Sequence, residues 1–139
     1  MEIRIYNSED YRAIAKLYKN SETFGGQFDE LRDAKVRLDE LVAKKPEAIL
    51  VAVENEIIVG TVTLFEDRRS AWLYRFAVLT EFEHEAVEKL GAKAKEILKK
   101  WGHSQMLVYA PAKDTHFEKR YKNIGFAKGN DFTAYWQNL

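Results

Sequence analysis

The 139-residue chain carries 22 basic and 22 acidic residues, so its formal net charge at neutral pH is zero. This balance argues against broad binding to nucleic acid or to an anionic membrane surface, where an excess of Lys and Arg supplies the affinity. The sequence has no Cys, which excludes disulfides, thiolate nucleophiles and Cys-ligated zinc and fits a reducing compartment.

Length and composition predict one globular domain spanning residues 1–139. The apolar fraction is 46% and the charged fraction 32%, which together allow a substantial core and a polar surface. No apolar run approaches the length of a membrane span, and the N-terminus lacks a signal-peptide pattern. We therefore expect a cytoplasmic protein with neither a membrane nor a nucleic acid as its partner.

Hydrophobic periodicity predicts the elements of the N-terminal half. Alternating apolar residues favour a first strand over Met1–Tyr6, and apolar residues at helical spacing favour a helix containing Tyr11–Tyr18. A second helix is expected to begin at Asp29 and to end before Pro46, because proline disfavours helix in the residue before it. Three strands should follow as a meander, over Ala48–Val53, Ile57–Phe65 and Trp72–Val78.

The C-terminal half opens with a change of period. After the last strand of the meander, apolar residues fall at helical spacing from Val87 to Trp101, and Gly102 supplies a stop. Beyond it we expect a strand over Met106–Tyr109, a helix capped near Asp114 and a last edge strand over Thr133–Trp136. The element order β-α-α-β-β-β-α-β-α-β predicts an α/β fold, with a mixed sheet flanked by helices on both faces.

The turn that enters the long helix has an unusual composition. It reads Glu81-Phe82-Glu83-His84-Glu85-Ala86-Val87-Glu88, with four carboxylates and no glycine. Because the first N–H groups of a helix lack internal partners, such a turn is a natural anion site. Carboxylates oppose an anion there, but each also stabilises a helix start by about 0.3–1 kcal/mol. A lost anion site and an ordinary helix start therefore both account for the glutamates.

The element order and two motifs resemble the GNAT superfamily of N-acetyltransferases over nearly the whole chain. The segment Arg75–Phe82 is similar to the ending of the family's fourth strand, with Thr80 where proline is usual. The segment Arg120–Phe126 looks like the family's Phe-Tyr-x-x-x-Gly-Phe motif, with Arg120 replacing the first aromatic residue. The resemblance implies a mainly antiparallel sheet in which the strands ending near Val78 and Tyr109 are parallel neighbours.

The resemblance also implies an acetyl-CoA-dependent N-acyltransferase. Aligned with the family's Gln/Arg-x-x-Gly-x-Gly/Ala turn, Glu83 takes the first position and Ala86 and Glu88 take the glycine positions. Weakened binding of acetyl-CoA is therefore expected. The acceptor would be a small-molecule or peptide amine, and the protein a monomer or homodimer. By resemblance, the cofactor-binding residues would be Phe76, Ala77, Val78, Ala86, Val87, Glu88 and Asp114.

Each candidate side chain also has a structural interpretation. The resemblance gives Tyr121 the role of the acid that protonates the departing CoA thiolate, but an amphipathic tyrosine also suits a sheet edge. Asp114 either contacts the cofactor or only caps the next helix. Glu66 and Glu81 are candidate general bases, and nothing in their spacing separates them. The three histidines show no ligand spacing and are expected at the surface, and no metal site is predicted.

Two functions from different classes fit these patterns. One is the N-acyltransferase, with an acceptor site shaped by Phe24–Gly26 between the first two helices, where the family often forms it. The other is a non-catalytic GNAT-like domain that binds a protein, peptide or metabolite through the same cleft. The tyrosine and Gly-Phe motif favours the enzyme, and the acidic turn favours the binding domain.

Overall fold

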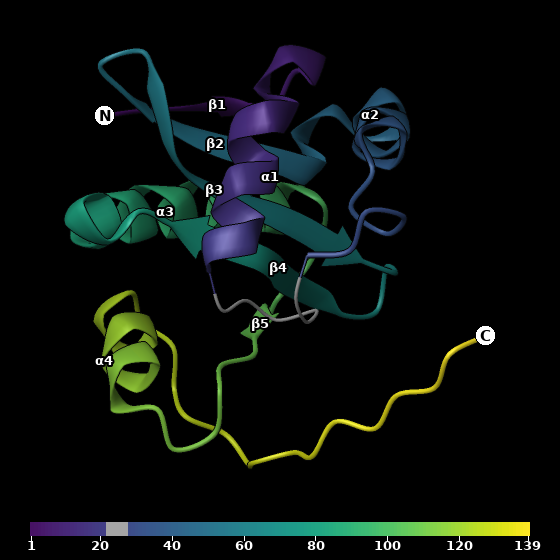
Figure 1. The fold of residues 1–139 in the computed structure, drawn as a ribbon. Helices are drawn as coiled ribbons and strands as arrows, with labels where there is room; N and C mark the ends of the chain where they lie inside the picture. The colour runs from purple at the N-terminus through teal and green to yellow at the C-terminus, as the bar shows by residue number, and fades with distance from the viewer. Residues whose placement is uncertain (22–27) are drawn as a thin grey trace.

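The computed structural model of the protein describes residues 1–21 and 28–139, and these form a sheet with helices on both faces (Figure 1). In the described residues five strands lie in the order β1-β2-β3-β4-β5, and every pairing is antiparallel except that of β4 with β5. This confirms the mixed, mainly antiparallel α/β fold and its expected parallel pair. The strands are β1 (Glu2–Ile5), β2 (Ile49–Glu54), β3 (Ile57–Glu66), β4 (Ala71–Val78) and β5 (Leu107–Val108).

Helices α1 and α3 cross opposite faces of the sheet, and α4 packs against α3 (Figure 1). No helix in the described ranges is long and apolar enough to cross a membrane. The predicted acceptor segment Phe24–Gly26 lies outside the described residues. The α-helices are α1 (Tyr11–Asn20), α2 (Lys35–Lys44), α3 (Glu83–Lys100) and α4 (Thr115–Asn123), and the 3₁₀ turns are η1 (Ser8–Asp10), η2 (Pro46–Ala48) and η3 (Thr80–Phe82).

Strand β2 is buried on both faces, as its continuous apolar run predicts. Leu50 and Ala52 point into the cluster that packs against α3, whereas Ile49 and Val51 point into the cluster beneath α1 and α2. All four residues are buried. The central strands therefore form the middle layer between two hydrophobic clusters.

Helix α3 lies close to β3 and β4 because one residue of the sheet has no side chain. A Cβ atom built on Gly60 would lie 2.9 Å from Val78 Cγ1 and 3.2 Å from Leu90 Cδ1. Leu90 is fully buried on α3, and Val78 ends β4. The glycine thus permits a close approach of three elements at the point where the chain enters its long helix.

Gly60→Ala should destabilise the protein by about 1–3 kcal/mol, since overpacking costs that much in a tight core. Without this close approach, alanine would be favoured over glycine in a strand by about 0.5–1 kcal/mol. A lower free energy of unfolding in the variant would therefore indicate that the added Cβ clashes with Val78 and Leu90. Urea unfolding measures it. The matched control is Gly129→Ala, where an added Cβ meets nothing within 4 Å. A neutral or stabilising Gly60→Ala would contradict the close approach.

The second helix begins later than predicted. The segment from Asp29 to Asp33 forms a turn, and α2 starts only at Lys35. The Asp29 carboxylate accepts hydrogen bonds from the amides of Leu31 and Arg32, and the Asp33 carboxylate accepts one from the Asp29 amide. These side-chain bonds compete with helix formation, as Asp residues often do. The prediction that the helix starts at Asp29 was therefore wrong.

The expected last strand is absent. Thr133–Trp136 has no strand partner among the described residues, and all residues from 129 to 139 are exposed. The chain passes Tyr109, whose ring centroid lies 6.3 Å from that of Phe132, and then runs away from the sheet (Figure 1). Strand β5 is only two residues long and offers little edge to pair with. The apolar composition of the tail predicted a strand, but the short neighbour leaves it without a ladder.

Candidate functional site

The second half of β4 extends beyond the end of β5. In the described chain β5 pairs only with Trp72 and Leu73 of β4. Further along, a bulge at Arg75, with φ +52°, adds one residue to β4 opposite β3. Bulges are common beside functional sites because they redirect the strand. The segment Phe76–Val78 thus has β3 on one side and no strand of the described residues on the other.

The 3₁₀ turn η3 joins this end of β4 to α3. The Phe82 amide donates to the Leu79 carbonyl at 3.0 Å, and the Glu83 amide donates to the Thr80 carbonyl. Two of the amides that could hold an anion are therefore bonded within the turn. Among the turn's predicted cofactor residues, Ala86 and Val87 are buried in the core under α3 and only Glu88 is exposed.

Glu83 connects the start of α3 to α4. Its Oε1 atom lies 2.9 Å from His116 Nε2 and 3.6 Å from Arg120 Nη1. Because a carboxylate oxygen can only accept, His116 donates from Nε2. The sequence left two explanations for Glu83, a lost anion site and an ordinary helix start. In the structure this residue bridges two helices.

Arg120 crosses the space between α4 and β4. Its Nη2 donates to the Phe76 carbonyl at 3.2 Å, and its guanidinium carbon lies 4.8 Å from the centroid of the Phe76 ring. The side chain is only 7% exposed, and burial lowers its pKa. Its Nε atom is buried without a hydrogen-bond partner in the described residues. A buried donor without a hydrogen-bond partner costs about 1–3 kcal/mol. Arg120 can therefore donate at least one more hydrogen bond than the described residues accept.

Tyr121 is the next residue on α4 and faces the core. It is 8% exposed, with ring centroids of Phe76, Phe117 and Phe126 within 5.9–6.3 Å. Burial raises the pKa of its phenol, so the hydroxyl stays protonated at neutral pH. That hydroxyl has no hydrogen-bond partner within residues 1–21 and 28–139. Its ring is packed as a structural tyrosine would be, while its proton is available for chemistry.

Asp114 is the N-cap of α4. Its carboxylate accepts hydrogen bonds from the His116 amide at 3.0 Å and the Phe117 amide at 3.2 Å. These two bonds account for the residue structurally, as its position before a helix predicts. The same cap fixes the start of the helix that carries His116, Arg120 and Tyr121.

Glu66 lies at the wrong end of the sheet for a general base. It ends β3 opposite Ala71, which starts β4, whereas the candidate site lies at Val78. At the strand rise of about 3.3 Å per residue this separation is roughly 20 Å. Of the two predicted bases only Glu81, exposed in η3, lies beside the site.

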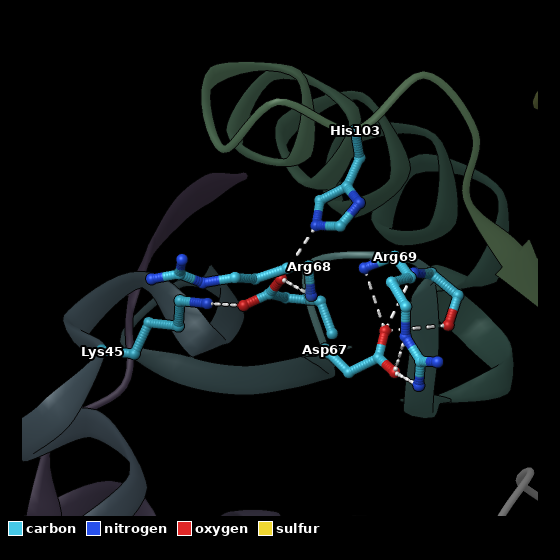
Figure 2. A network of polar contacts seen from close by, with 7 residues as sticks. Lys45, Asp67, Arg68, Arg69 and His103 are labelled. Carbon is cyan, nitrogen blue, oxygen red and sulfur yellow. Dashed lines mark hydrogen bonds and ion pairs between the residues drawn. The ribbon is translucent and has the colours of Figure 1, made fainter.

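Glu66 instead joins three segments in a polar network with Lys45, Arg68 and His103, which Figure 2 labels. Its carboxylate accepts hydrogen bonds from Lys45 and the Arg68 amide, and its Oε2 lies 2.9 Å from His103 Nε2. The His103 side chain is 5% exposed, so the expectation that every histidine lies at the surface was wrong here. A histidine after a helix stop carries no sequence signal of its partner, because that partner lies 37 residues away.

The Glu66 network should make stability depend on pH. Lys45, the Arg68 amide and His103 lower the pKa of Glu66 from 4.5 to about 2. A lowered folded-state pKa contributes stability above pH 4.5 that is lost as the pH falls toward 2. Glu66→Gln should cost about 1.5–3 kcal/mol at pH 7, the range for hydrogen bonds to charged groups. Urea unfolding from pH 7 to pH 2 measures this cost.

The difference between the wild type and Glu66→Gln should shrink across that acidic window. Glu40→Gln, at an exposed position on α2, is the control and should leave the stability essentially unchanged at every pH. A Glu66→Gln cost that stays constant down to pH 2 would mean that packing, and not the charge, explains it.

Comparison with known proteins identifies the fold. No protein-family model matches the chain, and no curated protein matches it in sequence. Several solved structures match the chain in fold. The aminoglycoside 6'-N-acetyltransferase AAC(6')-IG of Acinetobacter haemolyticus matches with a TM-score of 0.75 at 13% identity, covering 100% of this chain and 99% of that one. The chain has the GNAT fold.

Two more solved structures with a similar fold have different descriptions. AAC(6')-Iy, solved with a CoA-containing bisubstrate analogue, matches with a TM-score of 0.76 at 17% identity, over 99% of this chain and 98% of that one. A protein of Bacillus halodurans described as a transcriptional regulator matches with a TM-score of 0.75 at 16% identity, over 98% and 99%. At such identities the likeness establishes the fold and leaves the function to the site.

The end of β4 and the start of α3 would hold acetyl-CoA, the cofactor that the GNAT fold implies, but two contacts of the protein's own side chains would oppose it. The Glu83 carboxylate at the start of α3 would repel phosphates bound there, because like charges about 4 Å apart near a protein surface repel by roughly 4 kcal/mol. The Phe76 carbonyl, a predicted contact for the cofactor, already accepts from Arg120. Both obstacles come from side chains, so rotation of side chains could remove them.

Proposed function

We propose that this protein is a GNAT-type N-acyltransferase that acts on a small-molecule or peptide amine and binds acetyl-CoA weakly. The observation that supports it best is Tyr121. Its phenol is protonated, lies on α4 beside the free edge of β4, and has no hydrogen-bond partner in the described parts of the chain.

The acceptor amine would lie in a large hollow lined partly by α4. This hollow has a volume of about 1560 Å³ and lies between α4, the C-terminal end of α1 and the C-terminal tail. Tyr121 lines it, as do the rings of Tyr18, Phe28 and Tyr109.

Direct calorimetric titration with acetyl-CoA is the first test, followed by an assay of thiol release with a panel of small amines and N-terminal peptides. We expect binding that needs about millimolar acetyl-CoA, where ΔG is only about −4 kcal/mol, and amine-dependent thiol release at that concentration. No thiol release with any amine at saturating acetyl-CoA would contradict the enzyme function.

The second candidate is a non-catalytic GNAT-like domain that binds a protein, peptide or metabolite. The contacts of Arg120 with Phe76 and Glu83 support it, because they fill the groove beside β4 with the protein's own side chains. Absence of any heat of binding up to several millimolar acetyl-CoA, about the lower limit of useful affinity, would favour this candidate.

A further inference from the structure

Arg120 departs from the family motif, and the structure gives this departure a partner. The residue replaces an aromatic side chain, and Glu83 replaces a Gln or Arg in the turn before α3. In the folded protein these two exchanged residues meet, with 3.6 Å between Arg120 Nη1 and Glu83 Oε1. A cation on α4 and an anion on α3 thus stand together where neither pattern alone predicts a contact.

The cation is underused in this arrangement. Arg120 makes one hydrogen bond, to the Phe76 carbonyl, and its distance to Glu83 is longer than a direct hydrogen bond allows. Its Nε is buried without a hydrogen-bond partner in the described residues. A guanidinium can donate five N–H groups and matches phosphate oxygens in pairs. More acceptor oxygens could therefore be held at this place than Glu83 provides.

A small hollow adjoins the pair. It has a volume of about 230 Å³ and is lined by Glu83, Glu88, His116, Lys119 and Arg120, among others. Of its basic side chains, those of His116, Lys119 and Arg120 come from α4, whereas that of His84 and the two carboxylates come from the first turns of α3. Phosphate suits such a combination of Arg, Lys and imidazole donors once the carboxylate is removed.

We propose that the Glu83 side chain is an internal competitor that occupies Arg120 and His116, and that a phosphate-bearing ligand binds this hollow only by displacing it. The inference rests on the proposed function for the identity of the ligand, a CoA thioester. It adds two statements to the proposed function. The side chains of α4 hold the anion, and the Glu83 side chain causes the weak affinity.

The test is calorimetric titration at pH 7 with two probes, inorganic pyrophosphate and CoA, of the wild type and Glu83→Gln. The amide keeps the shape of the side chain and removes its charge. Glu83→Gln should bind both probes about tenfold more tightly or better, which corresponds to about 1.4 kcal/mol. Tightening for CoA alone would assign the effect to the rest of the CoA molecule and contradict a phosphate site.

Glu88→Gln is the matched control. Glu88 lines the same hollow but makes no ion pair or hydrogen bond with the described residues. Glu88→Gln removes the same net charge as Glu83→Gln. Because Glu88 does not bind Arg120 or His116, its substitution should tighten binding only slightly. Equal tightening in the two variants would show a general charge effect and overturn the proposal, as would no tightening in Glu83→Gln.

Adding Arg120→Met to Glu83→Gln should abolish the gain. Because burial of the new side chain could disturb the fold, Arg120→Lys is made as well, which keeps a cation but loses the paired donors and should keep part of the gain. A gain that persists in the Met double variant places the anion elsewhere and overturns the proposal. Tight phosphate binding without acetyl transfer would contradict the proposed function and leave this inference standing.

Discussion

Asp33→Asn is expected to destabilise the protein by about 3–5 kcal/mol, the cost of breaking a buried ion pair from one side. Arg75 Nη2 donates to Asp33 Oδ2 at 2.6 Å, and Nε donates to Oδ1 at 3.1 Å. The two side chains are 1% and 5% exposed. An amide at position 33 keeps the shape but removes the negative charge that faces the buried guanidinium of Arg75. Urea unfolding at pH 7 measures the loss.

Two further proteins separate the charge from the packing. Glu30→Gln changes an exposed neighbour in the same turn and should have little effect. The double variant Asp33→Leu/Arg75→Met removes both charges and should be more stable than Asp33→Asn, because it removes the buried guanidinium together with the carboxylate. A loss below about 1 kcal/mol in Asp33→Asn would mean that the pair behaves as a surface ion pair.

This ion pair links the loop after α1 to the bulge of β4. Arg75 holds a left-handed φ of +52°, a conformation unfavourable for a side-chain-bearing residue. The surrounding contacts must stabilise it, and Asp33 supplies two of them. Because Phe76 follows the bulge directly, the pair also fixes the carbonyl that Arg120 contacts. The stability of the core and the shape of the candidate site therefore depend on one interaction.

Local pattern was sufficient for most of the fold. The apolar run of Ala48–Val53 predicted a doubly buried strand, and the apolar spacing from Val87 to Trp101 predicted the long helix. These signals are local, because the spacing of apolar residues along a segment indicates which of its faces will be buried. The parallel pairing of β4 with β5 came from the resemblance to the GNAT family and was confirmed.

Contacts between distant residues escaped the sequence analysis. Asp33 and Arg75 lie 42 residues apart, and Glu83 and His116 lie 33 apart. A charged residue shows its sign in the sequence but not its partner, so Glu83 could not be recognised as a bridge. The tail failed for the opposite reason: Thr133–Trp136 has strand propensity, but propensity forms no strand without a neighbouring edge.

Tyr121→Phe is expected to lower the turnover of acetyl transfer by about 10²–10⁴-fold, the usual contribution of a positioned general acid. The substitution removes one hydroxyl and keeps the ring among Phe76, Phe117 and Phe126, so the fold should be unchanged. Since burial raises the pKa of the phenol, wild-type Tyr121 carries the proton throughout the neutral range. The measurement is kcat at saturating acetyl-CoA, with thermal unfolding to confirm an intact fold.

Tyr135→Phe is the control for this prediction, because Tyr135 is 93% exposed in the tail and loses the same hydroxyl. Its turnover should equal that of the wild type. The prediction also concerns kcat and not the affinity for acetyl-CoA, since Tyr121 does not line the hollow beside Glu83. Unchanged kcat in Tyr121→Phe would make the residue a packing tyrosine, and the proton for the leaving thiolate would then have to come from another group, with water the simplest source.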